Sequence, residues 1–331
     1  MTGVENGGES LVRARRSGTR GTKRRGMRIA VGLAVAVGLT VAAGVAWLLL
    51  AGYADLRTDV IKQKGVDSAL AARGRVLLFA AARSHGLEAW KRHRTFEAVA
   101  TDSWRSGSPW WPASPQRFRA RRRLGTFTSR VELLDGVHQR EIWGIQSWAA
   151  YKNRGLGEPS FARDRAIEFY LPTLQYFDEL PFRMLAAPVI LYAGEGLYVG
   201  QRYDKVFVSW GSPQPHAEHD QYLLWINPAT GLIDVVRYTL RDAVTMSSPI
   251  MRPVMKVFAA GTIHYRAYRR QDDVMVPFEQ TVALPPPEST HLPLEENYFH
   301  RLVLESARFD SFDPESLTVD PARPEVGDAK P

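Results

Sequence analysis

A β-hairpin is indicated by residues 222–233, which read YLLWINPATGLI. Apolar residues on either side suit strands, and the central Asn-Pro-Ala-Thr-Gly supplies residues with a fixed or positive φ. The segment Leu232 to Arg241 alternates along its length and carries apolar residues on both faces. This pattern predicts an antiparallel sheet with one face packed against a helix and the other face only partly solvated.

Similar strand patterns continue on both sides of this hairpin. Turn residues separate them, with Gly194-Glu195-Gly196 as one turn and Asp135-Gly136 as a tight hairpin turn. The predicted strands cover residues 96–104, 126–134, 138–148, 189–192, 197–201, 205–210, 220–226, 232–241, 262–270, 274–284 and 301–309. Apolar stripes predict helices at Val66 to Ala82 and at Asp164 to Phe177, the second broken or kinked near Pro172. The expected fold class is α+β.

The amino-terminal part of the chain has the pattern of a membrane anchor. Ile29 to Leu50 is a 22-residue stretch without charge, long enough to cross a hydrocarbon core of about 30 Å. Residues 1–28 hold eight basic and two acidic residues, so the positive-inside rule predicts that this arm stays in the cytoplasm. The alternative is a cleaved signal peptide, with Gly52-Tyr53-Ala54 as the cleavage site.

In both cases the main domain is exported. The expected organisation is a basic cytoplasmic arm (1–28), a single transmembrane helix in the cytoplasmic (inner) membrane (29–50), a periplasmic or other extracytoplasmic domain (51–312) and a disordered tail (313–331).

Composition narrows the classes of function. Of the formal net charge of +8, residues 1–28 carry +6, so the basic balance indicates membrane topology and no nucleic-acid partner. The chain has no cysteine, which excludes a disulfide framework, a thiolate metal site and anchoring through a lipidated cysteine. The domain must therefore be stable through its core.

Three motifs follow the first predicted helix in a definite order. They are SHGLEAW at residues 84–90, LPFR at residues 180–183 and YLLWINPATGLI at residues 222–233. In this order they resemble the outer-membrane lipoprotein-sorting (LolA/LolB-like) superfamily, in particular its uncharacterised envelope members. The resemblance covers about residues 66–312.

The resemblance implies a strongly curved antiparallel sheet, a half-barrel wrapped on one or two helices, with an apolar cavity for acyl chains or another lipophilic ligand. Such a site needs apolar walls and a few orienting polar groups, so no catalytic residue and no cofactor is expected. This chain departs from the family's soluble carrier through its anchor, which argues against ferrying a lipoprotein between membranes. The aromatic candidates to line core or cavity are Trp143, Trp148, Phe207, Trp225, Tyr238 and Tyr265.

A second candidate surface combines indole and basic side chains. Trp104, Trp110 and Trp111 precede a cluster formed by Arg117, Arg119, Arg121, Arg122 and Arg123. This combination suits an anionic lipid headgroup surface, near which each basic residue contributes about 1 kcal/mol. The alternative is a solvated loop or strand edge whose charges deter aggregation.

One cluster contains metal-ligand residue types, His216-Ala217-Glu218-His219-Asp220. It lies in an expected loop, where no helix or strand would position the ligands, so solvated polarity is expected and no metal site. The chain has no Gly-x-Ser-x-Gly elbow, and His85 is expected to cap or pack at a helix end. The sequence therefore predicts a protein that is not an enzyme.

The predicted function is binding of a lipophilic ligand, such as the acyl chains of a lipid or lipoprotein, by a membrane-anchored extracytoplasmic half-barrel. The alternative is an envelope protein-interaction or sensor domain in which the same fold has a filled core. Cavity volume is the physical quantity that separates the two.

Overall fold

The computed structural model describes residues 37–46, 52–105, 116–153, 158–241, 256, 260–284, 286–287 and 298–324. The chain divides into two compact units, Met1–Ala51 and Gly52–Pro331. Residues 37–46, within the predicted span, are helical and exposed, and the rest of that span lies outside the described residues. Among the helices that the structure describes, none combines the length and the apolar composition that crossing a membrane requires.

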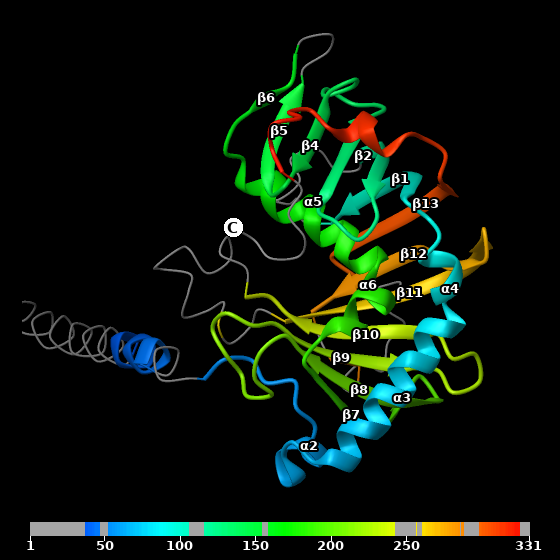
Figure 1. Cartoon of the computed structure of the whole chain (residues 1–331). Coiled ribbons are helices and arrows are strands. Elements are labelled where there is room, and N and C mark those ends of the chain that lie inside the picture. Colours follow the sequence, from blue (N-terminus) through cyan, green and yellow to red (C-terminus); the bar gives the residue numbers. More distant parts are fainter. Residues whose placement is uncertain are drawn as a thin grey trace, which may run out of the picture. The chain divides into compact units, whose positions relative to one another are not determined.

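One antiparallel sheet of thirteen described strands forms the second unit, in the order β6-β5-β4-β3-β2-β1-β13-β12-β11-β10-β9-β8-β7. The sheet is open, because β6 and β7 are its two edges, and it curves around the helices (Figure 1). The predicted α+β, half-barrel class is thus confirmed for the described part of this unit. The strands are β1 (Thr95–Trp104), β2 (Gln116–Arg123), β3 (Thr128–Leu133), β4 (Ile142–Gln146), β5 (Ala149–Asn153), β6 (Ser160–Phe161), β7 (Val189–Tyr198), β8 (Gln201–Ser209), β9 (Gln221–Ile226), β10 (Ile233–Thr239), β11 (Ala260–Gln271), β12 (Val274–Ala283) and β13 (His300–Phe309).

The helices of this unit are α2 (Asp59–Lys64), α3 (Ser68–Ser84), α4 (Leu87–Trp90), α5 (Arg165–Asp178) and α6 (Leu180–Arg183), and short 3₁₀ turns cover Met184–Ala186 and Pro314–Leu317. Helices α3 to α6 lie on one face of the sheet (Figure 1). Asp67 caps α3 by accepting hydrogen bonds from the backbone N–H groups of Ala69 and Leu70. Gly74 brings α3 onto β7, because a Cβ there would lie 2.6 Å from the carbonyl carbon of Leu191.

The apolar pattern on both faces of the strands has a structural counterpart. In β8, Val206 and Val208 pack in one cluster with Leu78 of α3, whereas Phe207 belongs to a second cluster with Ile61 of α2. Successive residues of a strand point to opposite faces, so both faces of this strand are covered. The second face is thus less solvated than expected here, since Phe207 is fully buried.

The predicted strands correspond to β1, β3, β4 and β7 to β13, whereas β2, β5 and β6 were not predicted. Gly194-Glu195-Gly196 is not a turn: β7 continues through it, with a register shift between Tyr192 and Glu195. Position 196 of this strand requires glycine, because a Cβ there would lie 2.5 Å from the indole ring of Trp225. The turn follows instead at Val199 and Gly200, which both have positive φ.

Two further expectations differ from the structure. Asp135-Gly136 does not form a two-residue hairpin, because β3 ends at Leu133 and β4 begins at Ile142; Asp135 instead accepts a hydrogen bond from the backbone N–H of Arg117. Residues 313–324 of the predicted disordered tail are ordered: Leu317 is buried. Gln146 accepts hydrogen bonds from the backbone N–H groups of residues 319 and 320. Residues 325–331 lie outside the described residues.

Candidate functional site

The space between the helices and the sheet is nearly filled. A central cavity of about 20 Å³ is lined by His85, Trp90, Phe177 and Phe182, among others. One water requires about 10–15 Å³ on the same scale, so this cavity has room for a water molecule and not for an acyl chain.

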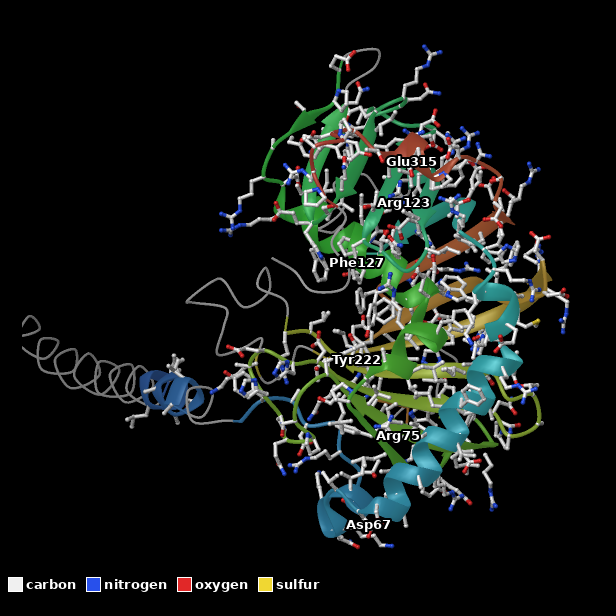
Figure 2. The ribbon with its side chains drawn as sticks, viewed as in Figure 1. Asp67, Arg75, Arg123, Phe127, Tyr222 and Glu315 are labelled. Atoms are coloured by element: carbon white, nitrogen blue, oxygen red, sulfur yellow. The ribbon has the colours of Figure 1, made fainter. Side chains whose placement is uncertain are left out.

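An open cleft of about 150 Å³ lies beside α5 and is wider than the central cavity. Its aromatic walls come from three places: the turns after β2 and β4, helix α5, and strands β9 and β10. Phe127 and Tyr222, labelled in Figure 2, lie on different parts of the sheet. The lining comprises Phe127, Trp148, Glu168, Phe169, Pro172, Thr173, Tyr176, Phe177, Asp220, Tyr222, Tyr238, Thr239 and Leu240. We refer to it as the aromatic cleft.

Trp148 reaches the aromatic cleft from an unusual backbone conformation. Ser147 and Trp148 connect β4 to β5 as a two-residue turn with φ values of 49° and 66°. Such turns favour Asn-Gly, and a bulky residue at positive φ is strained by about 1–3 kcal/mol. The turn holds the indole ring 4.4 Å from the ring of Phe127, so the strain is retained where the aromatic wall is built.

Phe177 lies between the two spaces in the sense that it lines both the aromatic cleft and the central cavity. Its ring lies 4.7 Å from that of Tyr238, and the Tyr265 hydroxyl donates to its backbone carbonyl over 3.0 Å. Phe177 is 8% exposed.

Polar groups in the aromatic cleft are hydroxyls and two carboxylates, those of Glu168 and Asp220. Burial raises the pKa of Tyr176, Tyr222 and Tyr238, so their hydroxyls stay protonated. Pro172 has no N–H to donate to the carbonyl of Glu168, which leaves that carbonyl without its helical partner. The cleft therefore offers aromatic walls with uncharged hydroxyls, two carboxylates and a backbone acceptor, a composition suited to a lipophilic ligand that also carries a polar group.

The six aromatic residues singled out from the sequence lie in different places. Trp148 and Tyr238 line the aromatic cleft, and Tyr265 lines the central cavity. Trp143, Phe207 and Trp225 are buried in the packed core. Sequence reasoning missed Phe127, Tyr176, Phe177 and Tyr222 as cleft residues, although Tyr176 and Phe177 stand in the helical pattern of 164–177.

A larger open pocket of about 530 Å³ lies at the β7–β8 hairpin and strands β10 and β11. Its lining includes Tyr198, Tyr203, Asp234, His264 and Arg266. Burial lowers the pKa of His264 to about 3, so its imidazole is neutral at physiological pH. Burial raises the pKa of Asp234. Its lining has four tyrosines, compared with seven aromatic residues in the smaller aromatic cleft, which makes this pocket a poorer match for a lipophilic ligand.

The arginine cluster forms strand β2, and its members divide between the two faces. Arg122 does not belong to an exposed surface: it is buried on the inner face and pairs with Asp178, and burial lowers its pKa to about 10. The four others each have a carboxylate partner, so the row they form is nearly neutral; Figure 2 shows Arg123 beside Glu315. The pairs are Arg117–Glu305, Arg119–Glu132, Arg121–Glu97 and Arg123–Glu315. Trp110 and Trp111 lie outside the described residues.

His85 holds the end of α3 against the sheet. Its backbone carbonyl accepts from the N–H of Met275, and its Nε2 accepts from the N–H of Ile233 over 3.0 Å. Burial lowers its pKa to about 4. These contacts are those of a packing and capping residue.

The solved structures that are similar to this chain include three bacterial proteins. A domain described as an outer membrane lipoprotein-sorting protein from Vibrio parahaemolyticus has 10% identity, coverage of 75% of this chain and 97% of that chain, and a TM-score of 0.47. A DUF1329 family protein from Desulfovibrio piger has 10% identity, coverage of 73% and 95%, and a TM-score of 0.44. A LolA superfamily protein from Nitrosomonas europaea has 8% identity, coverage of 74% and 97%, and a TM-score of 0.43.

Two of the three are described as lipoprotein-sorting or LolA superfamily proteins, the superfamily that the sequence resembles. Identities of 8 to 10% assign no ligand to this chain. No protein-family model matches the chain, and no curated protein matches its sequence.

Proposed function

We propose that this chain is a membrane-anchored extracytoplasmic protein that binds a lipophilic ligand, with no catalytic step, and that the aromatic cleft is where the ligand enters. The observation that carries the proposal is the cleft itself, an open space walled by seven aromatic side chains from three parts of the fold. An acyl chain or another apolar group would bury its surface there at about 25 cal/mol per Å².

The cleft volume sets a limit on the ligand. At about 150 Å³ it lies below the roughly 300–1,000 Å³ of drug-sized sites. It therefore takes one apolar segment of a larger molecule, and a longer segment enters the central cavity only when Phe177 moves. In this proposal the sheet is the rigid part of the site and Phe177 the movable one.

Native mass spectrometry on residues 52–331, one compact unit, tests the proposal. The domain is purified from bacterial membranes and periplasm without detergent, and any bound molecule is extracted and identified. A co-purified apolar molecule supports the proposal and names its class. An apo mass, together with no uptake of cis-parinaric acid, a fluorescent fatty acid, contradicts it.

Two variants locate the site. Trp148→Ala removes one wall of the aromatic cleft, and Phe79→Ala removes an aromatic ring that is 48% exposed on α3, outside the cleft. The proposal requires weaker cis-parinaric acid binding in the first variant and unchanged binding in the second. Equal affinities in both variants would place the ligand elsewhere.

The second candidate is an envelope protein-interaction or sensor domain. The observation that favours it is the central cavity of only about 20 Å³, which is what a filled core predicts. The apo outcome of the mass measurement would select this candidate.

The anchor and the topology are part of the same proposal. Their support is the uncharged stretch Ile29 to Leu50 after a strongly basic arm. Because the chain has no cysteine, labelling of a single introduced cysteine shows on which side of the membrane that one position lies. Val137→Cys, at a site 91% exposed, should react with a membrane-impermeant maleimide in spheroplasts, whereas Ser10→Cys should react only after lysis. The reverse pattern would reject the topology.

A further inference from the structure

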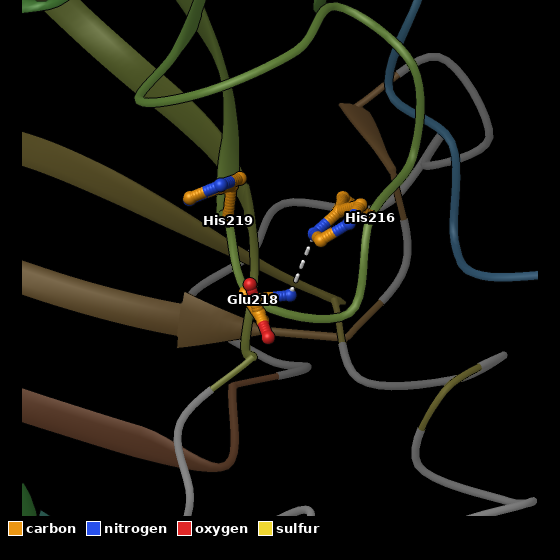
Figure 3. Close-up of side chains that lie close together, drawn as sticks. All are labelled: His216, Glu218 and His219. Atoms are coloured by element: carbon orange, nitrogen blue, oxygen red, sulfur yellow. Dashed lines mark hydrogen bonds between the residues drawn. The ribbon is translucent and has the colours of Figure 1, made fainter.

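Three residues with metal-binding side chains meet in the loop between β8 and β9. They are His216, Glu218 and His219, and one ligand atom from each lies within 4.8 Å of the other two. Figure 3 shows the three side chains gathered at one end of this loop. His216 and Glu218 are exposed and His219 is half-buried, so an ion would reach them directly from solvent.

The loop is held in place by contacts from three directions. The Ser209 hydroxyl donates to the carbonyl of Ser212 over 2.8 Å, and the Gln221 side chain donates to the carbonyl of Pro213 over 3.0 Å. Gln214 accepts a hydrogen bond from the Arg57 guanidinium. Two prolines also restrict the loop backbone. These contacts fix residues 212–214, which precede the segment with the three side chains.

Gly211 and the backbone of Glu218 orient the two imidazoles. A Cβ at Gly211 would lie 2.1 Å from Cδ2 of His219, so the missing side chain leaves room for that ring. The N–H of Glu218 donates to Nδ1 of His216 over 3.1 Å, drawn as a dashed line in Figure 3. Because Nδ1 accepts this bond, the proton of the neutral ring is on Nε2, so a bound ion would take the Nδ1 lone pair in place of this hydrogen bond. The two rings are stacked, with centroids 5.1 Å apart.

We propose that His216, Glu218 and His219 bind a divalent transition-metal ion of the zinc type. Two imidazoles and one carboxylate are a common three-residue ligand set for Zn²⁺, and water completes the tetrahedron. Bonds of about 2.0–2.1 Å place two ligand atoms about 3.4 Å apart, so ligand atoms that lie within 4.8 Å of one another must close by up to about 1.4 Å. Exposed side chains rotate by this amount on binding.

Asp220 is not included among the metal ligands, because its carboxylate is already engaged in hydrogen bonds within the fold. Its Oδ1 accepts hydrogen bonds from the Thr239 hydroxyl and the Arg241 backbone N–H, at 3.0 and 2.8 Å. These bonds fix the start of β9 directly after His219. The metal site is therefore attached to the sheet at one end, and it is independent of whether the aromatic cleft binds a lipophilic ligand.

Isothermal titration with ZnCl₂ tests the site. The full chain, without an affinity tag and in a non-ionic detergent, is first treated with a chelator and dialysed. One Zn²⁺ per chain is expected. His216→Ala and His219→Ala should each weaken binding by at least about tenfold, since even the loss of a ligand's hydrogen-bond partner costs that much. Glu218→Gln should weaken it less, because a neutral amide oxygen remains.

The matched control is His138→Ala. His138 also lies 3.0 Å from a carboxylate, that of Glu141, but no three-residue cluster includes it in the described part of the chain. This variant should retain the affinity of the unchanged chain for Zn²⁺. Circular dichroism without metal confirms that each variant is folded. Absence of zinc binding in the unchanged chain, or equal affinity in the double variant His216→Ala/His219→Ala, would overturn the proposal.

Discussion

The rings of Phe127 and Trp148 lie 4.4 Å apart, centroid to centroid, although each residue sits in a turn that connects different strands. Phe127 precedes β3 and Trp148 precedes β5. The pair closes one end of the aromatic cleft, and the backbone at Trp148 is strained to allow it. A contact that keeps strain in place is informative about function, because selection for stability alone would remove it.

Trp148→Gly separates stability from binding. Glycine adopts positive φ without strain, which offsets the lost packing of a ring that is only half-buried. We expect the free energy of unfolding to change by less than about 1 kcal/mol, while the affinity for cis-parinaric acid falls by about fivefold or more. Urea unfolding and fluorescence titration measure the two effects. A large loss of stability with unchanged affinity would show that Trp148 has only a packing role.

Phe177→Ala should join the aromatic cleft to the central cavity. We expect a loss of about 3–5 kcal/mol in stability, typical of a buried Phe→Ala change, together with tighter binding of longer fatty acids. The control is Phe169→Ala, on the same helix and equally buried at 8%, which lines the cleft and not the central cavity. This control variant should lose stability without any gain in affinity for longer fatty acids. The same chain-length dependence in both variants would contradict the gating role of Phe177.

The buried pair of Arg122 and Asp178 should be strongly coupled to folding. Gln280 also donates a hydrogen bond to Asp178. Asp178→Ala removes the ion-pair partner of the buried Arg122 guanidinium, which should cost about 3–5 kcal/mol of stability. The control Glu305→Ala removes the partner of Arg117, whose side chain is 46% exposed. That change should cost less than about 1 kcal/mol. Chemical unfolding measures the stability of both variants. Similar losses of stability would show that burial of the Arg122–Asp178 pair is unimportant.

His85 should make the domain less stable at acidic pH. Burial lowers its pKa to about 4 in the folded state, compared with about 6.5 when unfolded. Protonation therefore favours the unfolded chain, and this contribution is present above pH 6.5 and lost as the pH falls toward 4. The loss is roughly 3 kcal/mol over that window. His85→Gln keeps an acceptor for the Ile233 N–H and should flatten the dependence. Parallel pH profiles of the two proteins would contradict this prediction.

The outward arginines of β2 test the headgroup hypothesis. Because Arg117, Arg119, Arg121 and Arg123 each have a glutamate partner, the unchanged chain should bind anionic liposomes only weakly through this surface, and replacing all four by Gln should leave that binding weak. Replacing Glu305 and Glu132 by Gln should strengthen binding by releasing two cations. Sedimentation with liposomes at low and high salt measures both. A salt-sensitive loss in the four-arginine variant would support a headgroup surface instead.

The sequence predicted those elements whose information is local. The helix that begins after Asp67, and most strands of the sheet from β7 onward, follow from apolar periodicity and turn residues within short windows. Strand β2 could not be predicted in this way. Five of its eight residues are arginine and only Phe118 and Ala120 are apolar, so apolar periodicity does not indicate a strand there. The arginines are accommodated because carboxylates of β1, β3 and β13, together with Asp178 and Glu315, pair with them.

Sequence alone also indicated the resemblance of fold and the aromatic character of the site. The tertiary structure decided which aromatic residues meet: Trp148 and Tyr238 share a cleft, whereas Trp143 and Trp225 fill the core. It also decided that His216 and His219 lie together in a loop held from outside, where the sequence indicated only solvated polarity. The physical reason is the same in each case. Period and turn chemistry are properties of neighbouring residues, but a cavity, an ion pair or a ligand set depends on side chains that only the pairing of distant strands brings together.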